Sequence, residues 1–92
     1  MEKKTKRGKL EIMRDILKII RENKNLIKTT PLLRKSNLSS LRFQEYFSEL
    51  KEKGFIRETE DKTGRSVSLT DKGFRFLERY QAIISFIDEF EL

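Results

Sequence analysis

The chain has 92 residues, of which 36% are hydrophobic and 39% charged, so it is long enough for one domain with a single modest core. It has no apolar run of about 18 residues, which excludes a transmembrane helix, and no apolar region follows its basic start, which argues against a secretory signal. It has neither cysteine nor histidine, so disulfides, thiolate metal sites and imidazole catalysis are excluded.

The net charge of the chain is +6, from 21 Lys and Arg against 15 Asp and Glu. This excess on a small domain favours a polyanionic partner, although a Lys-rich solvated surface would give the same total. The distribution of charge along the chain favours a polyanionic partner, because the two ends of the chain differ. Residues 81–92 have three acidic residues and no basic one. Residues 1–9, in contrast, have only Glu2 against Lys3, Lys4, Lys6, Arg7 and Lys9.

Residues 9–23 are predicted to form an amphipathic helix, because apolar side chains recur there at helical spacing. These side chains are Ile12, Met13, Ile16, Leu17, Ile19 and Ile20. Gly8 marks the junction with residues 1–8, which we expect to be a flexible basic arm. Leu26 and Ile27 form an apolar link that is compatible with a small strand.

A helix-turn-helix is predicted next. Thr30, with Thr29 before it and Pro31 as the first helical residue, is expected to cap a short helix over residues 32–35. Asn37 is expected to end that helix in a left-handed conformation, with Leu38 buried in the turn. Ser39 should cap a third helix, which Gly54 ends. Its apolar stripe consists of Phe43, Tyr46, Phe47 and Leu50.

Two strands are predicted over residues 55–59 and 66–69, with residues 60–65 as the loop of a hairpin. Thr70 and Asp71 open a last helix that runs nearly to the end of the chain. The fold class is therefore mainly α with a small β-hairpin (α+β). We expect a basic arm at 1–8, a winged helix-turn-helix domain at 9–69, and a helix for core packing and dimerisation at 70–92.

These motifs resemble those of a known family. The residues that carry the resemblance are Ser36-Asn37-Leu38-Ser39, Tyr46-Phe47 with Leu50, Lys53-Gly54-Phe55-Ile56, and Leu69-Thr70-Asp71-Lys72-Gly73 with Phe76-Leu77. Over about residues 9–80 the chain is similar to the archaeal ten-kilodalton winged-helix DNA-binding proteins, which include chromatin-associated proteins and transcriptional regulators. The resemblance implies DNA binding. Chromatin members of the family dimerise through a long C-terminal helix, whereas the helix expected here is short.

The third helix is expected to enter the major groove of DNA with its N-terminal part. Ser39 and Ser40 are then candidates for phosphate or base-edge contacts, and Arg42, Gln44 and Glu45 for base reading, because Arg suits guanine and Gln suits adenine. The same positions also suit ordinary solvated residues. Three acidic residues cancel three basic ones between Ser39 and Lys53, so this helix is neutral.

The phosphate contacts are therefore predicted elsewhere. The candidates are the arm, the region of the second helix and the tip of the wing, with Arg57 on the adjoining strand. By residue they are Lys3, Lys4, Lys6, Arg7, Lys28, Arg34, Lys35, Lys62 and Arg65.

The last helix has a heptad-like seam, which predicts a homodimer. The seam consists of Phe76, Tyr80, Ile83, Ile87 and Phe90. A neighbouring stripe of Phe74, Leu77 and Ile84 is expected to pack on the domain's own core. The alternatives are one wide apolar face buried against the first helix, or membrane docking by Phe86, Ile87 and Phe90, which the acidic terminus disfavours.

The sequence thus predicts a double-stranded DNA-binding protein, either a transcriptional regulator or a chromatin-type architectural protein, in the cytoplasm and associated with the nucleoid. The alternative is a winged-helix protein-interaction module within a larger complex, which the neutral third helix supports; RNA binding is a weaker third option. We expect no enzymatic activity, cofactor, metal or small-molecule ligand. The four glycines are isolated, and Asp88, Glu89 and Glu91 are expected to be solvated.

Overall fold

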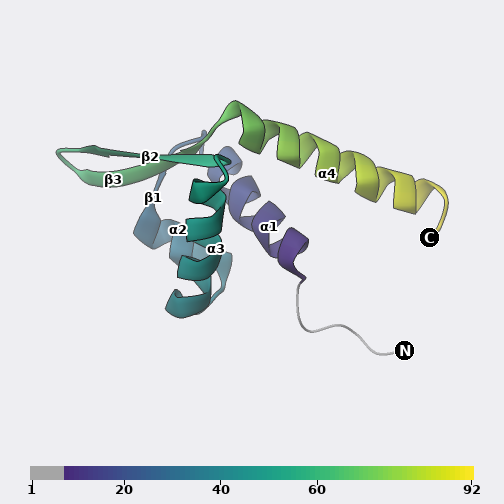
Figure 1. The fold of residues 1–92 in the computed structure, drawn as a ribbon, viewed down its shortest axis with the longest axis horizontal. Coiled ribbons are helices and arrows are strands. Elements are labelled where there is room, and N and C mark those ends of the chain that lie inside the picture. The colour runs from purple at the N-terminus through teal and green to yellow at the C-terminus, as the bar shows by residue number, and fades with distance from the viewer. Residues whose placement is uncertain (1–7) are drawn as a thin grey trace.

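The computed structural model describes residues 8–92, which form four helices and one three-stranded antiparallel sheet (Figure 1). The strand order in the sheet is β1-β3-β2. In chain order the elements are α1 (Lys9–Glu22), β1 (Ile27–Lys28), α2 (Thr29–Ser36), α3 (Ser40–Glu52), β2 (Ile56–Asp61), β3 (Gly64–Leu69) and α4 (Asp71–Glu89). The predicted winged helix-turn-helix with an added C-terminal helix is confirmed.

The core forms around the apolar face of α1, as its helical spacing predicts. The other helices and the sheet add apolar side chains to the same cluster, so that one core serves the whole domain. The buried residues are Ile12, Met13, Ile16, Leu17 and Ile20 of α1, Leu32 of α2, Phe43, Phe47 and Leu50 of α3, Ile27, Ile56, Val67 and Leu69 of the sheet, and Leu77 of α4.

The start of α2 differs from the prediction. The helix begins at Thr29, and Lys28 is its N-cap without a side-chain cap bond, so the predicted Thr cap with Pro31 as first helical residue is wrong. Pro31 is instead the third helical residue, still within the first turn, where a backbone N–H has no partner in the helix. β1 leads directly into the helix and fixes its start. The left-handed end at Asn37 is confirmed by its φ of 62°.

Both ends of α3 match the prediction. The Ser39 hydroxyl accepts a hydrogen bond from the Arg42 amide (3.2 Å) and caps the helix. At the other end, Gly54 has a φ of +81° and its amide donates to the Lys51 carbonyl (3.1 Å). The Phe55 amide donates to the Leu50 carbonyl (2.9 Å), which completes a Schellman motif. Leu38, expected to be buried, is only partly buried against the core.

The hairpin is longer than predicted. β2 and β3 pair as far as Asp61 opposite Gly64, so the turn consists of Lys62 and Thr63 alone. The predicted six-residue loop is wrong because cross-strand pairing overrides the turn preference of Glu60, Asp61 and Gly64. The apolar link of Leu26 and Ile27, which is compatible with a small strand, overlaps β1. This strand pairs with β3, with Ile27 opposite Val67.

The first half of α4 packs on the domain, and its second half extends beyond it (Figure 1). Thr70 caps the helix by accepting from the Gly73 amide (3.2 Å), as predicted. Gly73 and Leu77 are the buried residues of α4. Phe74, expected to pack on the core, is 37% exposed, whereas Phe76 of the predicted seam packs on Phe55. No helix within residues 8–92 is long and apolar enough to cross a membrane.

Gly73→Ala should destabilise the protein, although alanine is the better helix former. A Cβ atom at this position would lie 2.3 Å from the Phe55 carbonyl oxygen, which accepts from the Thr70 amide at 3.1 Å. The clash forces the start of α4 away from the hairpin and costs about 2 kcal/mol. Thermal unfolding at a fixed protein concentration should show a Tm lowered by roughly 10 °C. An unchanged or raised Tm would contradict this packing.

Candidate nucleic-acid interface

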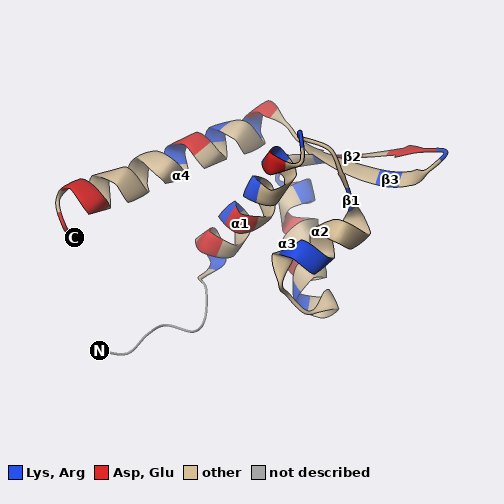
Figure 2. Ribbon diagram, turned by 180° about the vertical axis from the view of Figure 1, so that it is seen from behind, with Lys and Arg blue, Asp and Glu red and all other residues tan. Residues whose placement is uncertain are grey.

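The helix-turn-helix is the most basic part of the described chain. Residues 23–44 contain no Asp or Glu, and they fold as β1, α2, the turn and the first residues of α3. Figure 2 shows Lys and Arg on α2 without any acidic residue there. The basic side chains of this acid-free segment are Lys24, Lys28, Arg34, Lys35 and Arg42. Of these, Lys24 is the one that the sequence predictions did not include.

Hydrogen bonds fix the turn between the two helices. The Ser36 hydroxyl, buried in the core, donates to the Leu33 carbonyl (2.6 Å) and accepts from the Leu38 amide (3.3 Å). Arg34 and Lys35 are exposed immediately before this turn, and Ser39 and Ser40 immediately after it. The turn therefore brings the predicted phosphate contacts of α2 next to the capped N-terminus of α3, where the helix dipole is positive.

The exposed face of α3 begins with the predicted base readers. Leu41 is 72% exposed, and Arg42, Gln44 and Glu45 are also exposed. The Arg42 guanidinium lies 5.7 Å from the centre of the Tyr46 ring and donates to the Tyr46 hydroxyl (3.3 Å). Tyr46 therefore restricts the directions that this guanidinium can take, through one hydrogen bond and a cation–π contact.

The acidic residues of α3 are partly compensated towards its C-terminal end. Glu49 forms ion pairs with Lys9 (2.9 Å) and Lys53 (3.7 Å). The hydrogen bond from Lys9, helped by the charges of both lysines and opposed by desolvation, lowers the pKa of Glu49 below its ordinary value. Because this carboxylate is half-buried between two lysines, it contributes little repulsion to a polyanion near the start of the helix.

The wing has as many acidic as basic side chains: Arg57, Lys62 and Arg65 against Glu58, Glu60 and Asp61. Glu58 pairs with Lys51 (2.8 Å) and with Arg65 (3.8 Å). Lys62 lies exposed in the two-residue turn, whereas Arg65, predicted beside it at the tip, lies within β3 opposite Glu60. The wing is thus neutral and offers a single cation at its tip.

Lys28 faces the wing. Its ammonium group donates to the Thr63 hydroxyl and lies 3.8 Å from the Asp61 carboxylate. The hydrogen bonds from the Thr63 hydroxyl and amide, with the Lys28 charge, lower the pKa of Asp61. The predicted arm contacts Lys3, Lys4, Lys6 and Arg7 lie outside the described residues.

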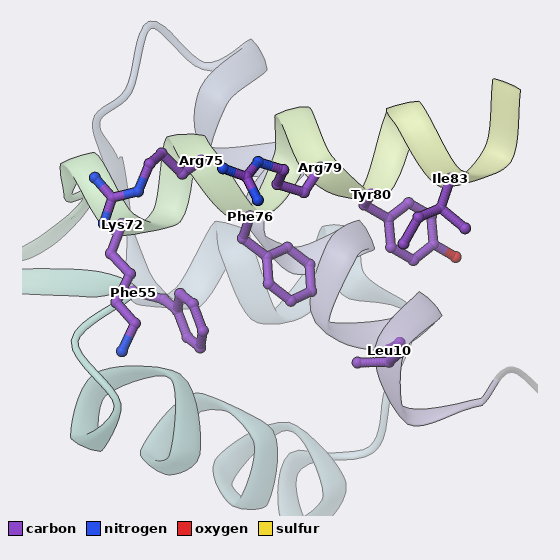
Figure 3. A pocket seen from close by; sticks show the side chains of 8 residues that line it. All are labelled: Leu10, Phe55, Lys72, Arg75, Phe76, Arg79, Tyr80 and Ile83. Atoms are coloured by element: carbon purple, nitrogen blue, oxygen red, sulfur yellow. The ribbon is translucent and has the colours of Figure 1, made fainter. Parts of the chain in front are cut away.

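A second surface lies along α4. An apolar groove of about 370 Å³ runs between α4, the start of α1 and Phe55 (Figure 3). It continues along α4 past Ile83 to Phe86, which are 58% and 55% exposed. Phe90, at the end of the helix, is 56% exposed. The side chains that line the first part of the groove are Leu10, Phe55, Lys72, Arg75, Phe76, Arg79, Tyr80 and Ile83.

This surface overlaps the predicted dimer seam without coinciding with it. Phe76 and Tyr80 are half-buried, with Phe76 against Phe55 at 5.2 Å between ring centres and Tyr80 beneath the Arg14 guanidinium at 4.9 Å. Ile87 is half-buried, and Ile83 and Phe90 are exposed. Leu10 and Phe55 were not foreseen as part of this surface, because they reach it through tertiary packing and belong to no periodic stripe of α4.

Two helices joined by a tight turn, followed by a hairpin that packs beside them, define a helix-turn-helix module with a wing. The winged helix-turn-helix family model matches residues 6–88, and the chain belongs to this family. No curated protein matches the chain significantly.

Solved structures share the fold at low sequence identity. Sso10a-2, a DNA-binding protein from Sulfolobus solfataricus, has a TM-score of 0.74 at 21% identity, over 92% of this chain and 86% of that one. F93 from STIV, a winged-helix DNA-binding protein, has a TM-score of 0.73 at 20% identity, over 86% and 91% of the two chains. The PcaV transcriptional regulator from Streptomyces coelicolor has a TM-score of 0.73 at 20% identity, over 87% of this chain and 58% of its own.

Proposed function

We propose that this protein binds double-stranded DNA through the helix-turn-helix. The observation that carries the proposal is the acid-free segment, residues 23–44, which folds into α2, the turn and the exposed start of α3. Arg34 and Lys35 would contact phosphates while the N-terminal part of α3 enters the major groove. Two proteins of the same fold, Sso10a-2 and F93, are DNA-binding proteins, which supports this assignment.

Base reading falls to the exposed residues Arg42, Gln44 and Glu45, with Ser39 and Ser40 near the backbone of the duplex. Tyr46 holds Arg42 ready for a bidentate contact with guanine. The basic arm and Lys62 add phosphate contacts outside the helix-turn-helix. The role is that of a transcriptional regulator or an architectural protein of the nucleoid in the cytoplasm. Since the chain has neither His nor Cys, we propose a binding role and not a catalytic one.

Binding should depend steeply on salt. If about six phosphates are contacted, log K should fall with log salt concentration at a slope near −5. The measurement is fluorescence anisotropy with a labelled random-sequence duplex of about 20 base pairs, titrated at several salt concentrations. A slope near zero, or no binding to any duplex at low salt, would contradict the proposed function. Selection from a random duplex pool then separates a regulator, which yields a sharp motif, from an architectural protein, which yields a flat one.

We also propose that the protein is a homodimer through α4. The seam of Phe76, Tyr80, Ile83, Ile87 and Phe90, joined by Phe86, forms an apolar surface on a helix that extends beyond its own domain (Figure 1). A soluble protein rarely leaves such a stripe uncovered. A symmetric partner would cover it and place two copies of α3 on one duplex.

A protein-interaction module is the second candidate, and one feature of α3 favours it. From Ser40 to Glu52 this helix has two basic and three acidic side chains, and Leu41 is its most exposed apolar residue. A helix of this kind suits a protein surface as well as a groove of DNA. Under this candidate the apolar seam of α4 binds a different protein, removal of residues 1–9 changes little, and no duplex is bound at low salt.

A further inference from the structure

Three residues from two parts of the chain meet at the tip of the wing. The Lys28 ammonium donates to the Thr63 hydroxyl, which in turn donates to the Asp61 carboxylate at 2.7 Å. The Thr63 amide donates to the same carboxylate oxygen at 2.8 Å, and Lys28 lies 3.8 Å from it. We call Lys28, Asp61 and Thr63 the wing brace. The ammonium, hydroxyl and carboxylate groups of the wing brace are thus already partnered with one another.

The backbone places Lys28 for this contact. It is the last residue of β1, it pairs with Ser66 of β3, and it is also the N-cap of α2. From there its side chain extends along β3 towards the turn, past Gly64. A Cβ atom on Gly64 would lie 4.0 Å from the Lys28 nitrogen, an ordinary contact distance, so the ammonium group lies directly beside this glycine, whose φ of +116° helps to form the turn. The brace thus ties the turn of the hairpin to the start of the helix-turn-helix.

Lys62 lies between the two wing residues of the brace. It is exposed and forms no ion pair within residues 8–92, so it is the cation that the wing offers to a duplex. Lys28, in contrast, is engaged by Thr63 and Asp61. We propose that Lys28 is a positioning residue, which holds the turn so that Lys62 meets a phosphate, and that Lys28 does not itself contact DNA. This inference rests on the proposed DNA binding.

The brace can be tested first in the free protein. Lys28→Met keeps most of the length of the side chain and removes its charged end, and Thr63→Val removes the hydroxyl at nearly constant volume. Both should lower the NMR order parameters of the Lys62 and Thr63 amides from about 0.85 towards 0.6, while α1 and α3 stay unchanged. Arg21→Met, an equal loss of charge on α1, is the control. Order parameters that stay at the wild-type value in both variants would overturn the brace.

The second measurement is a double-mutant cycle in DNA binding between Lys28→Met and Lys62→Ala. If Lys28 acts through Lys62, each single variant weakens binding about fivefold and lowers the salt slope by about one unit. The double variant should then bind no worse than Lys62→Ala alone. Additive losses, with a slope lower by about two units, would show that Lys28 contacts a phosphate itself and would overturn the proposal. A Lys28→Met variant that binds DNA with wild-type affinity would also overturn the proposal.

The two measurements separate the brace from the proposed function. If the wild-type protein binds no duplex, DNA binding fails and the positioning role fails with it, while the order parameters still decide whether Lys28 holds the turn. If the duplex is bound and the turn loosens without loss of affinity, DNA binding stands and the positioning role of Lys28 is wrong.

Discussion

Arg34→Ala/Lys35→Ala should weaken DNA binding about 100-fold at low salt and lower the salt slope by about two units. Both side chains are exposed in the last turn of α2, within the acid-free segment. Each is expected to make a charge-assisted hydrogen bond to a phosphate, which contributes about 1.5 kcal/mol. Because neither side chain takes part in the core, the Tm should change little. Anisotropy titrations over a range of salt concentrations measure both the affinity and the slope.

The matched comparison is Lys62→Ala/Arg65→Ala, which removes the same charge from the wing. Arg65 is already paired with Glu58 at 3.8 Å, so only Lys62 should contribute, and the loss should be about fivefold with a slope change near one unit. Both variants lower the net charge equally, so any difference between them reports on position and not on overall electrostatics. Equal losses would show that the wing binds phosphate as strongly as α2.

The comparison matters because sequence and structure distribute the basic charge differently. The sequence predicts Lys62 and Arg65 as a pair at the tip of a long loop, whereas the strands run to Asp61 and Gly64 and leave Lys62 alone there. Turn preferences are local, but the length of a hairpin depends on cross-strand contacts that a single chain segment does not reveal. The acid-free segment, in contrast, can be read directly from the sequence. The fold then brings its basic side chains together on one surface.

The helices show the same division between local and tertiary information. α1 and the caps Ser39 and Thr70 were predictable, because helical periodicity and side-chain capping are local signals. The start of α2 was not, because it depends on β1 pairing with β3 and no side chain caps it. The packing of Phe76 on Phe55 could likewise not be predicted from the sequence. Two neighbouring stripes on one helix do not reveal which of them its own domain covers.

Phe86→Ser/Phe90→Ser should convert the proposed dimer into a monomer, raising its dissociation constant by about 100-fold or more. Both rings are more than half exposed in the half of α4 that lies beyond the domain, and they contact each other at 4.9 Å between ring centres. Buried in a dimer, aromatic side chains of this kind contribute about 2 kcal/mol each. Light scattering coupled to size exclusion measures the mass over a range of concentrations.

Phe74→Ser is the control for that experiment. Phe74 is also partly exposed on α4, at 37%, but helical spacing puts it on the opposite side of the helix from the stripe of Ile83, Phe86 and Phe90. It should leave the mass unchanged. A wild-type protein that is monomeric at every concentration would contradict the dimer, and equal dissociation by Phe74→Ser would place the interface elsewhere on α4.

The charges of α4 favour an antiparallel pair of helices. Lys72, Arg75 and Arg79 line the groove on the first half of the helix, and Asp88, Glu89 and Glu91 lie at its end. Only an antiparallel arrangement brings each basic half to an acidic end, whereas a parallel one puts like charges together. Arg75→Glu/Arg79→Glu and Glu89→Lys/Glu91→Lys should therefore each weaken the dimer about tenfold at low salt.

The chain with all four substitutions decides the orientation. In an antiparallel dimer its reversed halves attract again, so the combined variant should recover close to the wild-type dissociation constant, and high salt should reduce the differences among the four proteins. In a parallel dimer each substituted residue faces its own copy, so like charges face each other before and after the substitution. Neither pair of substitutions then weakens the dimer, and the combined variant has no lost affinity to recover. Recovery by the combined variant is therefore the result that requires the acidic end of one α4 to lie against the basic groove of its partner.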